Sequence, residues 1–434
     1  MSDAQALSTV PCRSLAWRLA VPIPQRPYLV VVTFVMASGS IVLFEPAPYD
    51  IALVLLLAVG VISNRLAFHA SQRLPVALLA GFIAANFVSA PNAINGRTAL
   101  LYSLVNFYVA GSWLFFAGFT SKYGYRGVCA LMNGYMVGGV FSAVLATLSY
   151  LRLIPFQSIL LRYGRAQAFF KDPNVYGPYL VPIILFTLVT LLRTRLFSRG
   201  FLIALTICLV SALGVFLSFS RACWLNTAAG IACLVGLQTL YGLRMRAIQL
   251  GMLRIFLGIA ALVVTTVFFI GGSGTETRTM LLERVGNNGL HDYDAVRFGT
   301  QRRALDSALA QPLGMGTRQS ELVFDYATHN MYLRVLAENG ILGFACFSLF
   351  ILLSLMRSAK LALTLENNRW RDFFAVLTSC LAGVLVNGFV IDTIRWRHFW
   401  LLLGLAWCTP LVSSRTLADA QVSANSGNCS EARA

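Results

Sequence analysis

The residues from Thr328 to Gly343, THNMYLRVLAENGILG, hold the histidine with the clearest capacity for chemistry. His329 is followed directly by Asn330, and a mixed run leads from this pair to Gly340 and Gly343, where a long apolar stretch begins. The ordinary pKa of histidine, about 6.5, leaves a neutral imidazole available to accept a proton at neutral pH. A histidine at a helix start can also be a solvated cap, so this stretch alone leaves both interpretations open.

Arg221 lies in LSFSRACWL, between two apolar stretches that are separated by almost no loop. Its guanidinium must therefore lie close to the membrane surface or in a wet cavity, where an arginine is costly. One interpretation is that the side chain extends to the lipid headgroups. The other is a phosphate-binding role, because the planar fork of donors fits a diphosphate better than an ammonium does.

A third feature is the segment RFGTQRRALDSALAQPLGMG, which begins at Arg297. Apolar residues recur in it at helical spacing before Pro312 stops the helix: Ala304, Leu305, Ala308 and Leu309. We therefore predict an amphipathic helix outside the membrane, with Arg302 and Arg303 as candidate binding residues. Arg297 alone could equally be a solvated charge at the helix start.

Two shorter segments add candidate ligands. FFKDPNVYGPYLV, at 169–181, places Lys171 and Asn174 at the mouth of an apolar stretch. Asp-Pro-Asn is by itself an ordinary helix-start turn, so Lys171 is a supporting ligand only. DTIRWRHFW, at 392–400, places Arg395 among aromatic residues that are typical of a membrane-interface belt.

The composition sets the class of protein. Of 434 residues, 57% are hydrophobic and 12% are charged, which indicates a polytopic membrane protein. The net charge is +17, but the basic residues lie in short clusters between apolar stretches, where they orient helices or contact anionic membrane lipid. Nucleic-acid binding is therefore not expected. The cysteines show neither a paired framework nor a metal-ligand spacing.

About 20 mainly apolar residues are needed to cross a membrane as a helix, and the chain has about twelve such stretches. They lie near 28–44, 50–63, 75–90, 99–119, 127–150, 174–192, 200–219, 222–241, 253–272, 333–356, 373–391 and 398–414. We therefore predict an all-α fold: a cytoplasmic tail at 1–27, the first nine transmembrane helices at 28–272, a periplasmic loop with the amphipathic helix at 273–330, the last three transmembrane helices at 331–414, and a disordered cytoplasmic tail at 415–434.

The distribution of Lys and Arg predicts the orientation, because short cytoplasmic loops carry an excess of these residues. Alternate connections are basic, including those at 65–73 and 193–199, and are assigned to the cytoplasm. The opposite, periplasmic side then carries Arg221, Arg297 and His329. Topology does not require cations there, so several arginines on this side together indicate an anionic ligand.

Taken together, these segments resemble the family of O-antigen ligases and O-antigen or exopolysaccharide polymerases. The matching motifs, in the family's order, are Ser220–Arg221, Arg297, Pro312-x-Gly314-x-Gly316, His329–Asn330 and Gly340-x-x-Gly343. Many members carry a tryptophan where this chain has Gln301. The resemblance spans about 173–405 and implies a GT-C-like, all-α membrane glycosyltransferase with a helical periplasmic lid.

The resemblance implies transfer of a glycan from undecaprenyl diphosphate to an acceptor hydroxyl, at the periplasmic face of the bacterial inner membrane. His329 would be the general base, and Arg221 and Arg297 would clamp the diphosphate. Further substrate-binding residues would be Asn330, Lys171, Asn174, Arg302, Arg303 and Arg395. No metal or other cofactor is implied, and the sequence contains no metal-ligand spacing, Walker motif or dinucleotide-binding glycine motif.

Several functions remain open. A polymerase joins repeat units on two lipid carriers, and the compact interval from Arg297 to His329 favours this activity. A ligase would instead transfer the glycan to lipid A-core. A lipid-linked sugar flippase or transporter would also need a basic cavity, but the sequence shows no sign of two repeated halves. A purely structural role is disfavoured by the periplasmic arginines. Polysaccharide assembly proteins would be further partners.

Overall fold

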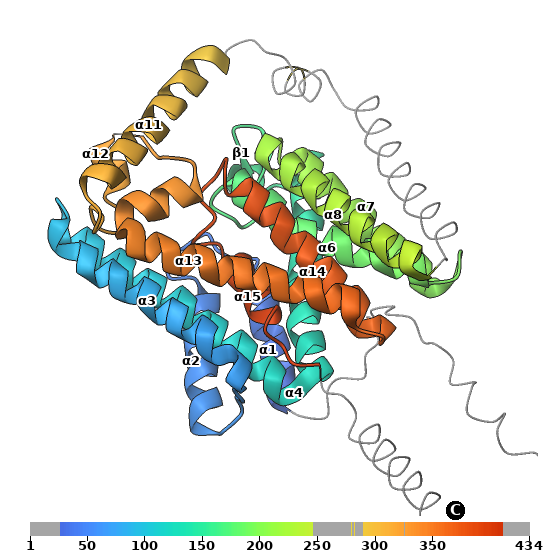
Figure 1. Ribbon diagram of the computed structural model, residues 1–434. Helices are drawn as coiled ribbons and strands as arrows, with labels where there is room; N and C mark the ends of the chain where they lie inside the picture. Colours follow the sequence, from blue (N-terminus) through green and yellow to red (C-terminus); the bar gives the residue numbers. More distant parts are fainter. Residues whose placement is uncertain (1–26, 246–278, 280–281, 283–289, 325, 411–434) are drawn as a thin grey trace, which may run out of the picture.

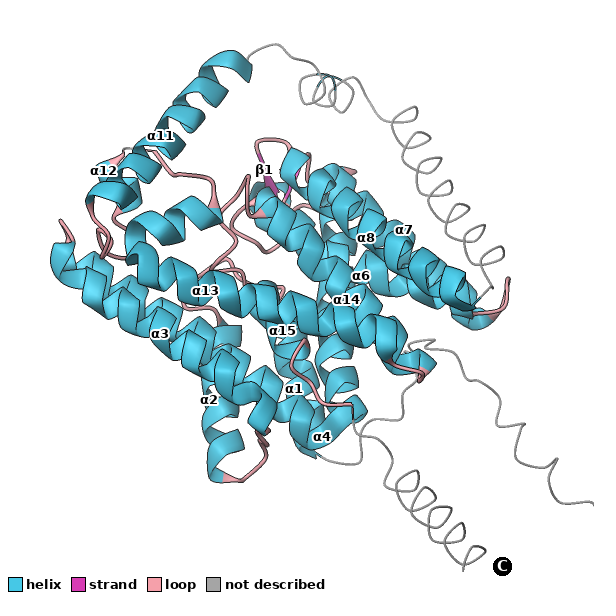
Figure 2. Ribbon diagram, in the orientation of Figure 1, coloured by secondary structure: helices cyan, strands magenta, loops and turns pink. Residues whose placement is uncertain are grey.

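The computed structural model describes residues 27–245, 290–324 and 326–410, together with residues 279 and 282. This part of the chain is almost entirely helical (Figures 1 and 2). Its helices are α1 (Pro27–Ser38), α2 (Pro48–Ile62), η1 (Ala70–Gln72), α3 (Arg73–Ser89), η2 (Ala90–Asn92), α4 (Gly96–Tyr150), α5 (Gln157–Leu160), α6 (Pro173–Arg193), α7 (Arg199–Leu217), α8 (Arg221–Met245), α11 (Leu290–Ala310), α12 (Ser320–Val323), α13 (Met331–Thr364), α14 (Asn368–Asn387) and α15 (Arg397–Leu405). An antiparallel pair of short strands joins β1 (Leu161–Arg162) to β2 (Arg165–Ala166).

Among the described helices, six are long and apolar enough to cross a membrane: the segment Ala70–Asn92 that contains α3, α4, α6, α7, α8 and α13. Helices α1 and α2 are shorter and equally apolar. The chain is therefore an all-α, multi-pass membrane protein. The predicted span at 253–272 and both predicted tails, apart from residue 27, lie outside the described residues.

Two predicted spans, at 99–119 and 127–150, form one element of the structure. Helix α4 is 55 residues long, and Gly124 inside it has a non-helical backbone with φ 55° and ψ −136°. Glycine adopts this conformation at little cost, so α4 consists of two helices joined at Gly124. The predicted last span at 398–414 is shorter than expected, because α15 ends at Leu405 and residues 408–410 are not helical.

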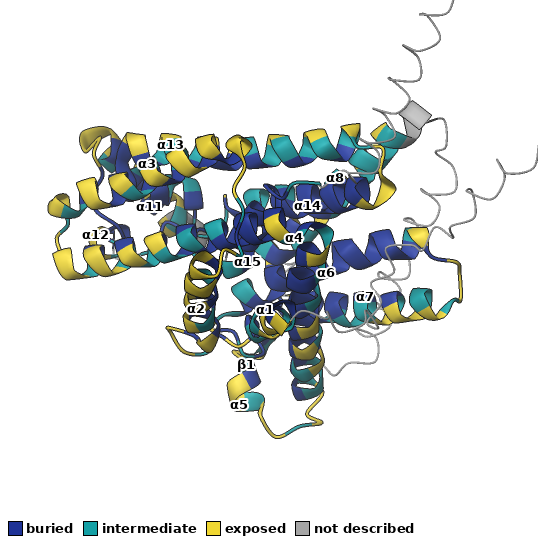
Figure 3. Ribbon diagram, turned by 90° about the horizontal axis from the view of Figure 1, so that it is seen from below, coloured by how far each residue is buried: buried dark blue, intermediate teal, exposed yellow. Residues whose placement is uncertain are grey.

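Helix α6 is the most enclosed of the long helices. In its most apolar window, 89% of the residues are buried inside the protein, against 33% for α8 and 39% for α13. Figure 3 shows the same difference, with α6 dark and the outer turns of other helices exposed. Helices α7, α8 and α14 pack around α6, and α13 packs along α3 in another part of the protein (Figure 1). The end of α6 is tied to α14 by Arg193, whose Nε lies 2.7 Å from Asp372.

Small residues let two of the helices approach closely. A Cβ atom added at Gly134 or Gly138 of α4 would lie 2.2 or 2.3 Å from the carbonyl oxygens of Thr33 and Ala37 in α1. Such contacts are typical of packed helices in a membrane, where dispersion contacts and not water exclusion hold the helices together. The two helices therefore pack nearly backbone to backbone.

A separate small core holds the elements outside the membrane helices. It is formed by Ala304 and Ala308 of α11 with Met315, Phe324 and Ala337. A helix is present where the amphipathic helix was predicted, and it ends at Ala310, before Pro312. Its predicted apolar face is only half confirmed, because Ala304 and Ala308 are buried whereas Leu305 and Leu309 are exposed.

Candidate functional site

His329 lies in the loop between α12 and α13, with its backbone in the left-handed region at φ 47°. Few residues other than glycine adopt this conformation, and those that do are held there by their surroundings. The imidazole is half-buried against the ring of Tyr326, with 5.3 Å between the ring centroids. Neither ring nitrogen has a hydrogen-bond partner among the described residues, so the ring is available to a ligand.

The neighbour of His329 has a structural contact of its own. The Oδ1 atom of Asn330 accepts hydrogen bonds from the backbone N–H groups of Tyr332 (3.0 Å) and Leu333 (3.1 Å). Asn330 is therefore the N-cap of α13. These hydrogen bonds fix the start of α13 two residues after His329 in the sequence.

Helix α11 holds the loop that carries His329. The Nη2 atom of Arg297 donates to the carbonyl oxygens of Val390 (2.8 Å) and His329 (3.3 Å). One turn along, Gln301 donates to the carbonyl oxygen of Thr328 at 3.2 Å. The Nε atom of Arg297 is buried and has no partner within the described part of the chain. The structure thus brings Arg297 and His329 together and leaves a donor of Arg297 unused.

The surroundings of His329 favour its neutral form. Burial lowers the pKa of the imidazole, and the positive charge of Arg297 lowers it further. Asp392, Glu321 and Asp172 act in the opposite direction and only partly offset the decrease. The pKa therefore lies below the ordinary value of 6.5, and His329 is a neutral base at neutral pH.

A buried network of charges lies behind this loop, centred on Arg334 of α13. Its guanidinium, 5% exposed, contacts Glu321 at 3.0 Å, Glu338 at 3.1 Å and Asp392 in a close ion pair. Burial disfavours the charged form of Asp392, but Arg334 and then Arg395 outweigh this effect and lower its pKa. Arg334 and Glu338 are not among the predicted site residues.

Glu338 connects α13 to the loop that follows α11. Its carboxylate, 2% exposed, accepts hydrogen bonds from the hydroxyl of Ser320 (2.5 Å) and the backbone N–H of Arg318 (2.7 Å), and it forms an ion pair with Arg334. Nε and Nη2 of Arg334 are buried and have no hydrogen-bond partner among the described residues. Arg334 and Glu338 are therefore held together by the attraction of their charges.

The two glycine motifs meet at this connection. Gly314 has φ 87° and Gly340 has φ 69°, both in the left-handed region. A Cβ at Gly340 would lie 2.3 Å from the carbonyl oxygen of Pro312, and one at Gly314 would lie 2.5 Å from that of Glu338. Only glycine fits at either position, so the two motifs allow the loop to lie directly on the backbone of α13.

The start of α6 lies near the histidine. Asp172 caps the helix through a 2.7 Å hydrogen bond from the backbone N–H of Asn174. The Oδ1 atom of Asn174 accepts a hydrogen bond from Nη2 of Arg165 (2.9 Å), and Nε of Arg165 donates to the carbonyl oxygen of Ser218 (2.8 Å). Arg165, which was not a predicted site residue, therefore fixes Asn174 against the end of α7.

Arg221 is the first residue of α8 and is exposed. The starts of α6 and α8 are adjacent, because a Cβ at Gly177 would lie 2.7 Å from the Sγ atom of Cys223. The guanidinium of Arg221 has no hydrogen-bond or ion-pair partner among the described residues. It is therefore an uncompensated cation at the same mouth as Asn174.

Three of the predicted ligands lie on the surface. Lys171 forms an ion pair with Glu45 (3.0 Å) in which both side chains are about half exposed, 45% and 58%. Arg302 is exposed, and Arg303 is exposed beside the ring of Phe324, 5.9 Å from its centroid. The structure does not place these three side chains in contact with His329.

Arg395 lies at the edge of the charge network. Its guanidinium is 4.0 Å from Glu338 and from Asp392 and lies over the ring of Tyr102, 4.6 Å from the centroid. Burial and the charge of Arg334 lower the pKa of Arg395 to about 10. Arg318 lies over the same ring at 4.7 Å, so two cations share Tyr102.

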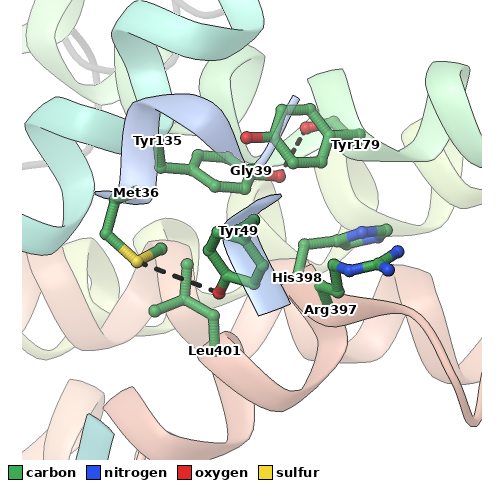
Figure 4. Close-up of a pocket in the computed structure, with 8 residues that line it drawn as sticks. All are labelled: Met36, Gly39, Tyr49, Tyr135, Tyr179, Arg397, His398 and Leu401. Atoms are coloured by element: carbon green, nitrogen blue, oxygen red, sulfur yellow. Dashed lines mark hydrogen bonds between the residues drawn. The ribbon is translucent and has the colours of Figure 1, made fainter. Parts of the chain in front are cut away.

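A small pocket lies at the start of α15, lined by Met36, Gly39, Tyr49, Tyr135, Tyr179, Arg397, His398 and Leu401. Figure 4 shows the side chains of Arg397 and His398 side by side at its edge. Arg397 is neutralised by Asp50, with contacts of 2.7 and 2.5 Å. Arg397 therefore joins α15 to α2 and is not free to bind an anion.

A comparison with known families identifies a segment that contains six of the predicted site residues: Arg221, Arg297, Arg302, Arg303, His329 and Asn330. Residues 205–348 match the family model described as O-Antigen ligase. This segment is therefore similar to O-antigen ligases. The match covers roughly a third of the chain and confirms the resemblance that the motifs predicted. A comparison with curated proteins finds no match.

The matched segment, residues 205–348, does not contain the whole candidate site. Asp392 and Arg395 follow it in the chain, and Asp172 and Asn174 precede it. Within the described residues, no group of three or more His, Cys, Asp or Glu side chains is placed to hold a metal ion. The domain match supports a membrane enzyme that transfers lipid-linked glycans.

Proposed function

We propose that the protein is a glycosyltransferase that polymerises oligosaccharide repeat units linked to undecaprenyl diphosphate. The observation that carries the proposal is the placement of His329. Its backbone is left-handed, its pKa is lowered, and its ring nitrogens have no partner among the described residues. Its carbonyl oxygen also accepts a hydrogen bond from Arg297. A solvated helix cap would need none of these features, and the cap of α13 is Asn330.

In this reaction, neutral His329 takes the proton from the acceptor hydroxyl as its oxygen attacks the anomeric carbon of the donor sugar. The bond between that carbon and the phosphate oxygen breaks. The electron pair leaves with the diphosphate, so negative charge develops on a group that is already a good leaving group. The protein's main tasks are therefore to remove one proton and to stabilise the departing diphosphate.

Arg297 and Arg221 are the proposed clamps on the diphosphate. The buried Nε of Arg297 has unused hydrogen-bonding capacity in the described structure, although its Nη2 atom is held by two carbonyl oxygens. Arg221 is an exposed cation at the start of α8, where the helix dipole also favours an anion. Arg165 fixes Asn174 beside it, and Lys171, Asn174 and Arg395 would contact the more distant parts of the substrates.

The charge network behind the loop would position the base. Asp392 acts on His329 directly through its charge, whereas Arg334 and Glu338 act through Asp392 and through the loop at 314–320. Arg334 and Glu338 are therefore positioning residues in this proposal. Asn330 would contribute by fixing the start of α13.

The number of membrane spans, the fold and the side of the membrane on which the site lies belong to the same proposal. About twelve spans, a GT-C-like fold and a site on the periplasmic face of the inner membrane would place His329 where lipid-linked repeat units are displayed. The basic connections on the opposite side support this orientation, as does the Arg193 end of α6.

A second candidate activity is the transfer of a finished glycan to lipid A-core. The description of the matched family, O-Antigen ligase, favours it. The short interval between Arg297 and His329 favours the polymerase. Both reactions use the same base and the same leaving group, so the site chemistry is common to them. A flippase or transporter would have no use for a histidine held in this way.

The test is turnover of the purified full-length chain, reconstituted in lipid, with a repeat unit linked to undecaprenyl diphosphate. The polymerase proposal predicts longer lipid-linked glycans with this substrate alone. Products that form only when lipid A-core is added would show the ligase instead. Release of no undecaprenyl diphosphate in either mixture, from protein that binds the donor, would contradict glycan transfer altogether.

A further inference from the structure

Helix α11 carries a second stripe of apolar residues. No described part of the protein covers this stripe. Thr300, Ala304 and Ala308, spaced by four residues, face α13 and are buried. Phe298, Leu305 and Leu309 share another face, at i, i+7 and i+11, and are 63%, 42% and 71% exposed. Leu313, just beyond the helix, continues the stripe and is 61% exposed.

Helix α11 is attached at two points to the boundary of the membrane helices. At its eighth residue, Arg297 donates to the carbonyl oxygen of Val390, three residues beyond the end of α14. Beyond its end, the carbonyl oxygen of Pro312 accepts a 2.9 Å hydrogen bond from Ile341, directly after the break in α13 at Gly340. The helix therefore bridges the ends of α14 and the long part of α13.

This attachment sets the direction of α11. The part of α11 between the two anchor points runs from Arg297 to Ala310, 13 residues further on, which corresponds to about 20 Å of helix. A helical stretch of this length that is held on both sides at the membrane boundary lies along the membrane surface and does not stand out from it. Figure 1 agrees, because α11 runs across the direction of α3 and α13.

The exposed stripe is continuous with residues that face lipid. Ile341 and Leu342, which begin the long part of α13, are 53% and 60% exposed, as expected of a membrane helix surface. The hydrogen bond between Pro312 and Ile341 places Leu313 next to them. Arg302 lies within the stripe and is exposed, so its guanidinium can reach headgroup phosphates while its methylenes lie on the acyl region.

We propose that α11 is an interfacial helix whose stripe of Phe298, Leu305, Leu309 and Leu313 is inserted into the lipid leaflet on the face that carries His329. The occupant of this surface is the phospholipid leaflet itself. An amphipathic helix of this kind buries its apolar face at the boundary of headgroups and acyl chains. The attachment through Arg297 then holds the His329 loop at the depth of the lipid headgroups.

The experiment places one cysteine, carrying an environment-sensitive fluorophore, in a cysteine-free full-length chain reconstituted in phosphatidylethanolamine and phosphatidylglycerol vesicles. The test position is Leu309. The matched control is Ala310, which is also exposed and lies at the same height along the helix, but about 100° round it. Doxyl-labelled lipid and aqueous iodide are the two quenchers.

The proposal predicts that doxyl lipid quenches the label at Leu309 about twofold more than the label at Ala310, and that iodide shows the reverse order. Strong quenching by iodide at Leu309, with little by lipid, would show that the stripe faces water and would overturn the proposal. Protection from both quenchers would show that protein covers the stripe, which overturns it equally. A label at Leu305 must give the same pattern as Leu309, so that a single misfolded variant cannot decide the result.

Discussion

Replacement of Glu338 by glutamine should destabilise the segment that holds His329. Glutamine keeps the volume of the side chain but removes its charge and one acceptor oxygen. Glu338 is 2% exposed and accepts from Ser320 and Arg318 as well as pairing with Arg334. The substitution therefore leaves a buried guanidinium with less negative charge around it, and places an N–H group where donors already point.

The size of the effect follows from the burial of the pair. Loss of one partner of a buried ion pair typically costs 3–5 kcal/mol, because the other charge stays buried without compensation, and about 3 kcal/mol is expected here. Arg334 keeps Glu321 and Asp392, which places the value at the lower end of that range. A pair of this kind on an exposed surface would contribute about 1 kcal/mol or less.

The measurement is the free energy of unfolding of Glu338→Gln in mixed detergent micelles, with the donor-turnover rate of the same preparation. Glu366→Gln is the matched control, because Glu366 is exposed. Glu338→Gln should lose about 3 kcal/mol, and the control should change by less than about 0.5 kcal/mol. Equal stability of the two variants would refute the role of Glu338 as the link between α13 and the loop at 314–320.

Three further results are expected. Arg221→Lys and Arg297→Lys should insert normally yet lose most turnover, because lysine keeps the charge but not the fork of donors; near-normal rates in both would remove the support for a diphosphate clamp. The lowered pKa of His329 means that the neutral base persists below its usual range, so kcat/KM should fall only below pH ~6.5, and a decline that begins at higher pH would contradict this. Gly340→Ala should lower the free energy of unfolding by more than about 1 kcal/mol, since Cβ would meet the carbonyl oxygen of Pro312 at φ 69°, whereas Gly96→Ala, which meets nothing within 4 Å, should not.

The sequence predicted an all-α membrane protein correctly, because the long helices are runs of apolar residues, but only six of the described helices are long and apolar enough to cross a membrane, where about twelve spans were predicted. Their ends were harder to predict. Gly124 divides α4 in the gap between the predicted spans at 99–119 and 127–150, so the division itself was predicted. The helical structure that continues through 120–126 on both sides of Gly124 was not predicted. The last helix, α15, ends at Leu405 although the apolar residues continue, because hydrophobicity indicates membrane or core but does not fix where a helix stops.

The predicted apolar face of α11 shows a related limit. Spacing shows which residues share a face of a helix, but not which face another element covers. Ala304 and Leu305 are both apolar and adjacent, yet the alanine is buried in the small core with Ala337 of α13, whereas the leucine is 42% exposed. The structure was needed to separate the two stripes.

The site was predicted in part. His329 and Arg297 were selected from their motifs, and the structure brings them together. Arg334 and Glu338 were missed, although a signal was present: two opposite charges at i and i+4 at the boundary of a membrane helix are costly there and need partners. Asp392, a further partner of Arg334, lies 58 residues beyond it, a contact that periodicity cannot reveal.

The central claim is that His329 is the general base, and the most direct measurement is the rate of glycan transfer by His329→Ala in reconstituted vesicles. We predict a loss of about 10²–10⁴-fold in rate, with donor binding and the free energy of unfolding nearly unchanged. A variant that transfers glycan at near the normal rate, or one whose only defect is lower stability, would contradict the account.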